Sequence, residues 1–416
     1  MKNRYALRVH LTGAAVARTG DEMSGPALLL TALALTGSTA TASVLLAGMT
    51  FAAAVGGPLL GLLLDRSTRP GALLAAALAG HCLALLAVLW TLHAHGELPL
   101  VMTLLIALGA GLLGPVLSAG WTSQLPRLAG PAALPRATAL DAMTFHVAAL
   151  VGPALAGTAA GLLGAGTGVV VAAVLIALSL PAALSVPPDP SRRAARNPRS
   201  GDLPVLLLAD RRLRTELRSG YRATVRNRPL ARATTVTVIS CAGEGAFVVC
   251  VPLLGGQLLG DPDRGVILLS GIAVAAVAAN ALLARRPPRR GPDRILNWSP
   301  LALALAYALM ATGQPVLLVV AVVLAGAGEG PQLTALFTIR HREAPERLRA
   351  QIFTTGASLK LTGFAVGAAL AGLVISLGSL TAALLAAAAV QLIAALCAAP
   401  TTARHPGRLR FRSPES

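Results

Sequence analysis

Six charged residues stand inside long apolar stretches of this sequence, where charge is costly. They are Arg18, Asp21, Glu22, Glu244, Glu329 and Lys360. At the centre of a bilayer each would cost about 2.5–3.5 kcal/mol, so each needs a reason to be there. Loss of water favours the protonated form of a carboxyl group, so an acid whose access to water changes can take up and release a proton. The pattern therefore predicts a proton-coupling or substrate-binding site.

The composition places these residues in a membrane. Of the 416 residues, 55% are hydrophobic and 12% are charged, and the mean hydropathy is +0.70. About 20 apolar residues in a helix cross the ~30 Å hydrocarbon layer, and runs of that length recur along almost the whole chain. We expect an all-α integral membrane protein with twelve transmembrane helices. The predicted spans are 10–36, 39–64, 72–93, 98–124, 138–164, 166–186, 232–258, 265–284, 295–312, 315–338, 350–377 and 379–399.

The basic residues indicate how these helices are oriented. The net charge is +18, and 32 of the 35 Lys and Arg fall at the two termini or in every second connection between spans. This alternation follows the positive-inside rule and predicts that both termini are cytoplasmic. Topology and attraction to anionic lipid thus explain the charge, and we expect the lipid bilayer rather than a nucleic acid as the partner.

One long polar segment divides the spans into six and six. We expect a six-helix bundle at 1–186, a basic cytoplasmic linker at 187–231, a second six-helix bundle at 232–399 and a basic cytoplasmic tail at 400–416. Within the linker, 205–228 has Arg on one side and Leu on the other, which suits a helix at the membrane interface.

The two halves repeat each other in sequence. GAGLLGPVLSA from Gly109 matches GAGEGPQLTAL from Gly326, and VGPALAG from Val151 matches VGAALAG from Val366. Because each half has six spans, both halves start on the same side and are parallel repeats. Such an architecture places a site at the midplane, between the halves.

Gly61, Asp65, Arg66 and Arg69 form the pattern GLLLDRSTR between the second and third spans. The pattern resembles the GxxxDRxxR signature of the major facilitator superfamily. The resemblance implies that the glycine allows close helix approach, and that the aspartate and arginine form charge contacts that hold the outward-open arrangement and break as the halves rock. A polar loop that obeys the positive-inside rule would explain both arginines but not Asp65. The equivalent loop of the second half has Ala284 in place of the aspartate, so we expect a one-sided gate.

Gly152, Pro153 and Gly157 in VGPALAG are similar to part of the antiporter motif of the same superfamily, which is associated with exporters. Pro153 removes a backbone donor and bends the helix, and the glycines let a neighbouring helix pack closely. The resemblance is greatest to bacterial drug and natural-product exporters of the proton-antiporter type. It implies that helices one, four, seven and ten line the central cavity.

Three of those cavity helices carry acids near mid-depth. Counting about 1.5 Å per residue from the cytoplasmic end puts Asp21 and Glu22 about 19 Å deep, Glu244 about 18 Å deep and Glu329 about 14 Å deep. Glu244 has no obvious partner in the sequence, so it is the first candidate for a substrate or proton contact.

Two ion pairs are possible among these residues. Arg18 lies three residues before Asp21 and four before Glu22, so it can pair with either one and leave the other for coupling. Lys360 lies about 15 Å deep and matches Glu329, and that pair is either permanent or broken by a proton or a cationic substrate.

Three other polar residues in the spans have structural explanations. Asp141 is expected in the first turn of the fifth helix, where the helix N-terminus favours an acid. His81 and His146 are expected to be packed polar residues.

The sequence lacks the signatures of an enzyme. GxxxxGK[ST] is absent, and GAGLLG matches GxGxxG only inside an apolar span, without a strand before it. The four cysteines form no CxxC pair, so no metal site is predicted. We expect no catalytic residues, no cofactor, a proton gradient as the energy source, and a monomer.

Several functions remain open. The first is secondary active export of small amphipathic compounds by proton antiport, in the inner (plasma) membrane as a multi-pass protein. An importer of a metabolite or sugar is the second, although the spans offer few aromatic and amide groups to bind a sugar. Arg18 and Lys360 could also receive an anion, as in a siderophore exporter. A membrane scaffold or sensor that does not transport is the last.

Overall fold

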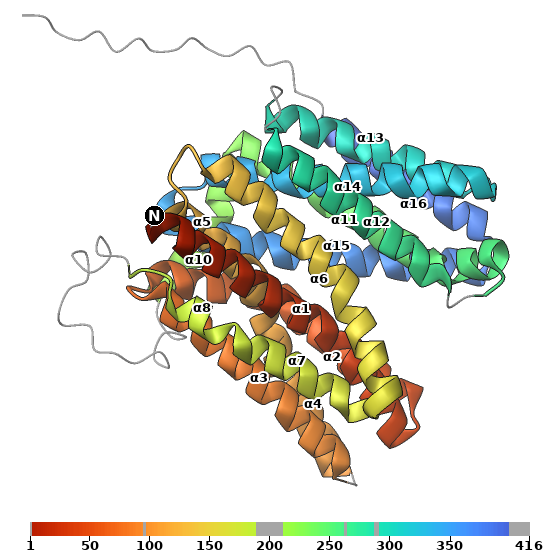
Figure 1. The fold of residues 1–416 in the computed structure, drawn as a ribbon, viewed down its shortest axis with the longest axis horizontal. Coiled ribbons are helices and arrows are strands. Elements are labelled where there is room, and N and C mark those ends of the chain that lie inside the picture. The colour runs from red at the N-terminus through yellow and green to blue at the C-terminus, as the bar shows by residue number, and fades with distance from the viewer. Residues whose placement is uncertain (1, 95–96, 189–210, 262–263, 287–290, 399–416) are drawn as a thin grey trace, which may run out of the picture.

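The computed structural model describes residues 2–94, 97–188, 211–261, 264–286 and 291–398, and every regular element in these ranges is helical. Figure 1 shows two groups of long helices that meet at one end of the molecule and diverge toward the other. The fold is therefore all-helical, with its two halves in closest contact at the end where the N-terminus lies.

The first group is formed by residues 2–184. Its elements are α1 (Lys2–Thr36), α2 (Thr39–Arg66), α3 (Pro70–His93), α4 (Glu97–Pro115), the π-helical turn η1 (Val116–Gly120), α5 (Trp121–Leu128), α6 (Leu134–Leu163), α7 (Ala165–Leu178) and α8 (Leu180–Leu184).

The linker helix α10 (Arg211–Arg226) precedes the second group. That group contains α11 (Arg228–Leu259), α12 (Gly265–Arg285), α13 (Pro292–Met310), α14 (Pro315–Glu343), the 3₁₀ turn η4 (Glu346–Leu348), α15 (Arg349–Ser376) and α16 (Leu380–Ala398). The predicted surface helix at 205–228 lies partly outside the described residues, and α10 is the part that the structure describes.

Within the described ranges, ten helical stretches are long and apolar enough to cross a membrane. The long helices α1 and α13 are not among them. Arg18, Asp21 and Glu22 lie near the middle of α1, and α13 begins with polar residues that include Asp293 and Arg294. The count of twelve spans and the cytoplasmic position of the termini stay predictions.

Several helices extend beyond the apolar runs that predicted them, and the extensions of four or more residues are toward the arginine-rich connections or the basic N-terminus. α6 begins at Leu134 rather than 138, α11 begins at Arg228 rather than 232, and α14 ends at Glu343 rather than 338. Hydropathy marks the edge of the hydrocarbon layer, whereas backbone hydrogen bonds continue the helix into polar surroundings. Arg136, Arg228 and Arg342 therefore lie on helix ends.

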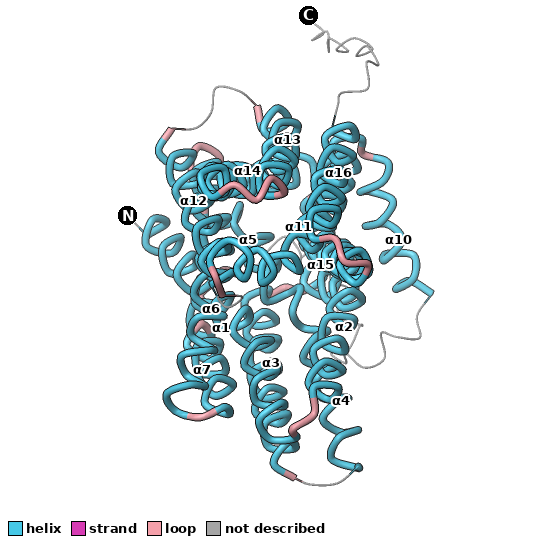
Figure 2. Tube along the Cα trace, turned by 90° about the vertical axis from the view of Figure 1, so that its right-hand side faces the viewer, coloured by secondary structure: helices cyan, strands magenta, loops and turns pink. Residues whose placement is uncertain are grey.

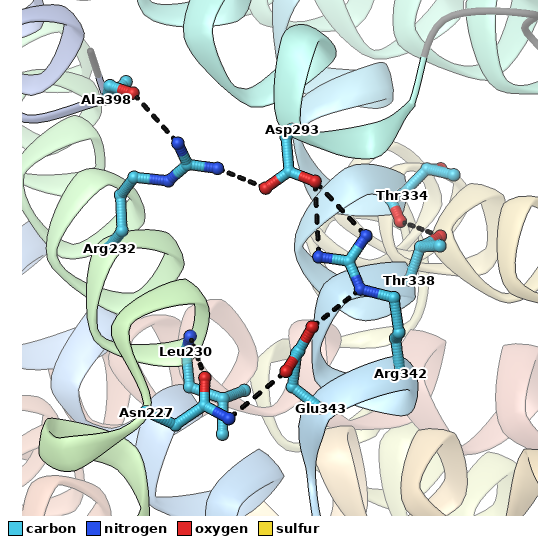
Figure 3. Close-up of polar contacts among 9 residues, drawn as sticks. All are labelled: Asn227, Leu230, Arg232, Asp293, Thr334, Thr338, Arg342, Glu343 and Ala398. Atoms are coloured by element: carbon cyan, nitrogen blue, oxygen red, sulfur yellow. Dashed lines mark hydrogen bonds and ion pairs between the residues drawn. The ribbon is translucent and has the colours of Figure 1, made fainter. Parts of the chain in front are cut away.

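Charged side chains join these ends in the second group (Figure 3). Arg232 of α11 and Arg342 of α14 both donate to Asp293 of α13, the latter at 3.2 Å. Glu343 accepts from Arg342 at 2.8 Å and from Asn227 at 3.2 Å. Some of the arginines that indicate topology thus also fasten neighbouring helices to each other.

The connections at the opposite ends of the helices are short and turn at glycine. Gly37, Gly164, Gly260, Gly313 and Gly378 have φ values of 64°, 99°, 78°, 68° and 89°. Residues with a side chain rarely adopt this left-handed region, so glycine permits the chain to reverse at once. One end of the molecule thus has tight turns and the other has arginine-rich connections.

Each group has its own apolar core. One cluster is built from α1 to α8 and another from α11 to α16. A third, smaller cluster joins the groups, with Phe145 of α6 beside Phe337 of α14 at a ring-centroid distance of 5.5 Å. The halves are thus separate cores with a limited apolar bridge between them.

Candidate functional site

The two groups meet along α2 and α15, in a contact that we call the seam, and also where α6 packs against α12 and α14. Thr354 Oγ1 donates to the carbonyl oxygen of Gly57 at 2.7 Å, and Ser358 Oγ donates to that of Ala53 at 2.6 Å. A Cβ atom at Gly57 or Gly61 would collide with atoms of α15. The seam is close because α2 presents glycines where α15 presents hydroxyl groups.

Asp65 lies at the end of the seam and is buried. Its carboxylate oxygens accept from the backbone N–H groups of Ala350 at 3.0 Å and Gln351 at 2.8 Å, at the start of α15. The N-terminus of a helix carries partial positive charge and unpaired donors, so a carboxylate stabilises it. A residue of the first group therefore caps a helix of the second.

The two arginines of the same loop differ in their surroundings. Arg66 Nε pairs with Glu216 of the linker helix α10 at 2.7 Å, whereas the Arg69 side chain is exposed. Gln351 also reaches α10, because its Nε2 donates to the carbonyl oxygen of Leu217 at 3.2 Å. The linker helix thus contacts both sides of the seam, which the sequence did not predict.

Replacing Gly61 by valine is expected to prevent the seam from closing. The new side chain would meet backbone atoms of Ala350 and Gln351, which cannot move aside as a flexible side chain can. Spin labels on the two groups should report a wider separation at this end. Gly157→Val is the control, because a Cβ there has no neighbour within 4 Å. Equal behaviour of the two variants would contradict the close contact.

Arg18 pairs with neither of the acids that the sequence offered. Its Nη1 lies 2.9 Å from Asp141 Oδ1 of α6, and both side chains are buried. The guanidinium also donates to Thr144, to Thr122 Oγ1 at 2.9 Å and to the carbonyl oxygen of Ser118 at 2.9 Å. The pairing along α1 that the spacing allows does not occur, because η1, α5 and α6 supply a fuller set of acceptors.

Asp141 is also placed differently from the prediction. Since α6 begins at Leu134, this residue lies two turns into the helix and does not interact with the helix N-terminus. Thr122 donates to its second carboxylate oxygen at 2.7 Å, and the Phe145 ring lies 3.7 Å from Arg18 Cζ. Arg18, Thr122, Asp141 and Thr144 form a buried network that joins α1, α5 and α6.

Asp21 and Glu22 consequently form no ion pair with Arg18. Asp21 Oδ1 lies 3.8 Å from His81 Nε2, and His81 Nδ1 lies 3.1 Å from the carbonyl oxygen of Ala110. Glu22 is exposed and has no ion pair within the described ranges. Neither acid lines the two cavities described below.

The motif in α6 packs closely at one of its glycines only. A Cβ at Gly152 would lie 2.8 Å from Glu22 Cβ and 2.9 Å from the backbone nitrogen of Met23. Gly157 is exposed, with no atom within 4 Å of its Cβ position. The close helix contact expected at both glycines therefore occurs at Gly152 and not at Gly157.

A mostly apolar cavity of about 680 Å³ lies between the groups. Its lining comes from α6, α11, α12, α14 and α15, and includes Pro153, Phe247 and Phe364. Its ionisable lining residues are His146, Glu244 and Glu329, and these three also line a smaller adjoining cavity. The larger cavity thus has room for a small organic compound.

The smaller cavity is lined by the charged residues that the sequence placed inside the spans of the second group, and we call it the acidic pocket. Glu244, Glu329, Lys360 and His146 line it. Glu329 and Lys360, which the sequence places at similar depth, both line this cavity, but no ion pair between them occurs within the described residues. Glu244 accepts a hydrogen bond from the Cys241 thiol at 3.4 Å. In the described part of the chain, no group of three His, Cys, Asp or Glu side chains could hold a metal ion.

Sequence reasoning missed the hydroxyl groups of the seam. Thr354 and Ser358 are four residues apart, as are Gly57 and Gly61, so each pair lies on one helix face. A small residue repeated at four-residue spacing is a general signal of helix contact in membranes. The signal could have identified both faces, but not that they face each other.

The fold and the cavity between its halves are those of a membrane transporter. A family model described as Major Facilitator Superfamily matches residues 11–299. This chain therefore belongs to the major facilitator superfamily. It is 30% identical over 303 residues to the uncharacterized MFS-type transporter y4rN of Sinorhizobium fredii (strain NBRC 101917 / NGR234), a match that covers 72% of this chain and 70% of the relative.

Solved structures share the fold at low sequence identity. A bacterial homologue of the iron transporter ferroportin, in an outward-facing state, has a TM-score of 0.73 at 14% identity and covers 94% of this chain and 98% of its own. The proton:xylose symporter XylE gives 0.69 at 12%, covering 95% of each chain. The human organic anion transporter MFSD10 (TETRAN) gives 0.67 at 16%, covering 96% and 100%. Their named substrates differ widely, so these similarities concern the fold alone.

Proposed function

We propose that this transporter exports small amphipathic compounds in exchange for protons, by alternating access in the inner (plasma) membrane. The moving units are the bundles 1–186 and 232–399, and the protein works as a monomer. The observation that carries the proposal is the acidic pocket, where Glu244 and Glu329 open into a mostly apolar cavity between the groups.

The chemistry of this cavity supports an exchange. Its apolar wall suits the hydrophobic part of an amphipathic compound, and its two acids can hold either a proton or a cationic group. Binding of one would then weaken binding of the other, because both are attracted by the same negative charge. Lys360 limits the excess negative charge of the pocket and leaves it able to respond to a single added charge.

The seam supports the second part of the proposal, which is alternating access. Asp65, Thr354 and Ser358 hold α2 and α15 together at the arginine-rich end, while the groups diverge at the end with glycine turns. With the arginine-rich end in the cytoplasm, this arrangement exposes the cavity to the outside. Breaking the seam would open it inward.

Replacing Glu244 by glutamine is expected to lower substrate-dependent proton flux about tenfold or more, which corresponds to a loss of ~1.4 kcal/mol. The measurement uses the full-length protein in liposomes with a trapped pH dye, an imposed pH gradient, and cationic, neutral and anionic compounds, siderophores included. Glu329→Gln should have a similar effect. Glu346→Gln is the matched control, since that side chain is 88% exposed.

Each other outcome would favour a different function. Normal proton flux in both pocket variants would remove these acids from the coupling mechanism. Flux with siderophores alone would identify an exporter of anions. Uptake of sugars or metabolites together with protons would indicate an importer. Absence of any compound-dependent flux, with the protein folded, would favour the scaffold or sensor.

A further inference from the structure

The outer face of the linker helix α10 carries exposed charge that the transport mechanism does not use. Arg218, Arg222 and Arg226 are spaced four residues apart, so they line one side of the helix, and all three are exposed. Beside them are Tyr221, 64% exposed, and Val225, 52% exposed. Within the described ranges none of these arginines forms an ion pair. We call the three the outer-face arginines.

The inner face of the same helix is fastened to the seam. Glu216 pairs with Arg66 at the end of α2, and the carbonyl oxygen of Leu217 accepts from Gln351 at the start of α15. Gly220 lies so close to the Gln351 amide that a Cβ there would collide with it. Figure 2 shows α10 at the edge of the molecule, with α15 and α11 on its inner side.

We propose that the outer face of α10 binds the headgroups of anionic phospholipids, and that this binding holds the seam closed. Guanidinium groups form paired, charge-assisted hydrogen bonds with phosphate oxygens. An anionic membrane surface attracts arginine about fivefold per residue. Tyr221 and Val225 favour a lipid over a soluble anion, because an aromatic ring and an apolar side chain gain from insertion at the interface.

Lipid binding on the outer face of α10 is linked to the seam by the contacts that the inner face of α10 makes. α10 contacts the end of α2 and the start of α15, so parting these helices must break the contact with Arg66 or the contact with Gln351. A lipid that restrains α10 therefore makes parting harder. Lipid on α10 would hold the helices of the seam in this way whatever the substrate or the coupling ion.

The test measures the seam directly in membranes of known charge. The full-length protein, with its four cysteines replaced, carries spin labels at Ala72 of α3 and Arg347 of η4, both exposed and on different groups. Distances between the labels are measured in nanodiscs of phosphatidylcholine alone and with added phosphatidylglycerol. Retention of phosphatidylglycerol by the detergent-purified protein is measured separately by native mass spectrometry.

One variant replaces the outer-face arginines by glutamine, and the control makes the same change at Arg285, Arg286 and Arg294, which are exposed and lie away from the seam. In the wild type and the control, phosphatidylglycerol should lower the open fraction about fivefold or more. In the outer-face variant it should have no effect on the open fraction, and the retained lipid should be lost.

Two results would overturn the proposal. Equal lipid retention by the outer-face variant and the control would show that α10 is not the binding surface. Loss of retained lipid in the outer-face variant, with phosphatidylglycerol still lowering its open fraction as much as in the control, would show that lipid on α10 does not hold the seam.

Discussion

Replacing Asp141 by alanine should destabilise the folded protein by about 3–5 kcal/mol, because Arg18 would remain buried without its counter-charge. Asp141 is 0% exposed and Arg18 is 2% exposed, so water cannot take the place of the lost carboxylate. The free energy of unfolding can be measured by titrating the detergent-solubilised protein with dodecyl sulfate and following its circular dichroism. Glu346→Ala, at an 88% exposed position, should change it by less than ~0.5 kcal/mol.

A double variant tests whether the loss comes from the unpaired charge. Arg18→Met with Asp141→Leu replaces the ion pair by apolar side chains, an exchange that is often neutral or stabilising in buried sites. We expect the double variant to unfold near the wild-type midpoint. A double variant as unstable as Asp141→Ala would contradict this explanation. If it is stable, its proton flux shows whether Arg18 also takes part in coupling.

Replacing Asp65 by asparagine should slow transport about tenfold or more while substrate affinity stays near the wild-type value. A hydrogen bond to an ionised group contributes about 1.5–3 kcal/mol, and Asp65 accepts two from the start of α15. Asparagine has a single acceptor oxygen and no charge, so the closed seam should lose stability. Initial transport rates in liposomes and ligand titration of the same preparation measure the two quantities.

Arg69 offers a comparison within the same loop. Its side chain is exposed, and exposed charges contribute little in water, so Arg69→Gln should have a much smaller effect on transport. A large affinity loss in Asp65→Asn with an unchanged rate would contradict the role of Asp65 at the seam. That result would place Asp65 in the binding site.

The sequence indicated where most of the long helices lie, because apolar runs of membrane length leave few alternatives, and ten described stretches are long and apolar enough to cross a membrane. It was less informative about where helices end. Charge stops an apolar run at Arg232, but the backbone of α11 is already helical at Arg228. The π-helical turn at Val116–Gly120 was not predicted either, although Pro115 immediately before it lacks a backbone donor.

Counting depth along the helices indicates which residues lie at one level, but it does not indicate which side chains pair between helices. Glu329 and Lys360 were expected at one level and share the acidic pocket. Arg18 was compared only with its neighbours along α1, whereas its partner Asp141 is 123 residues away. Pairing along one helix follows from spacing, but pairing between helices depends on how they pack.

The glycine turns that connect helices at one end of the molecule have a practical consequence for antibody work. Connections of a few residues at Gly164, Gly313 and Gly378 offer little protruding surface for an antibody fragment to grip. Fragments selected against intact cells would find few epitopes if this end faces outward, as expected. Selection on the purified protein from the arginine-rich side, where α10 stands at the edge, should give reagents that also lock one conformation for imaging.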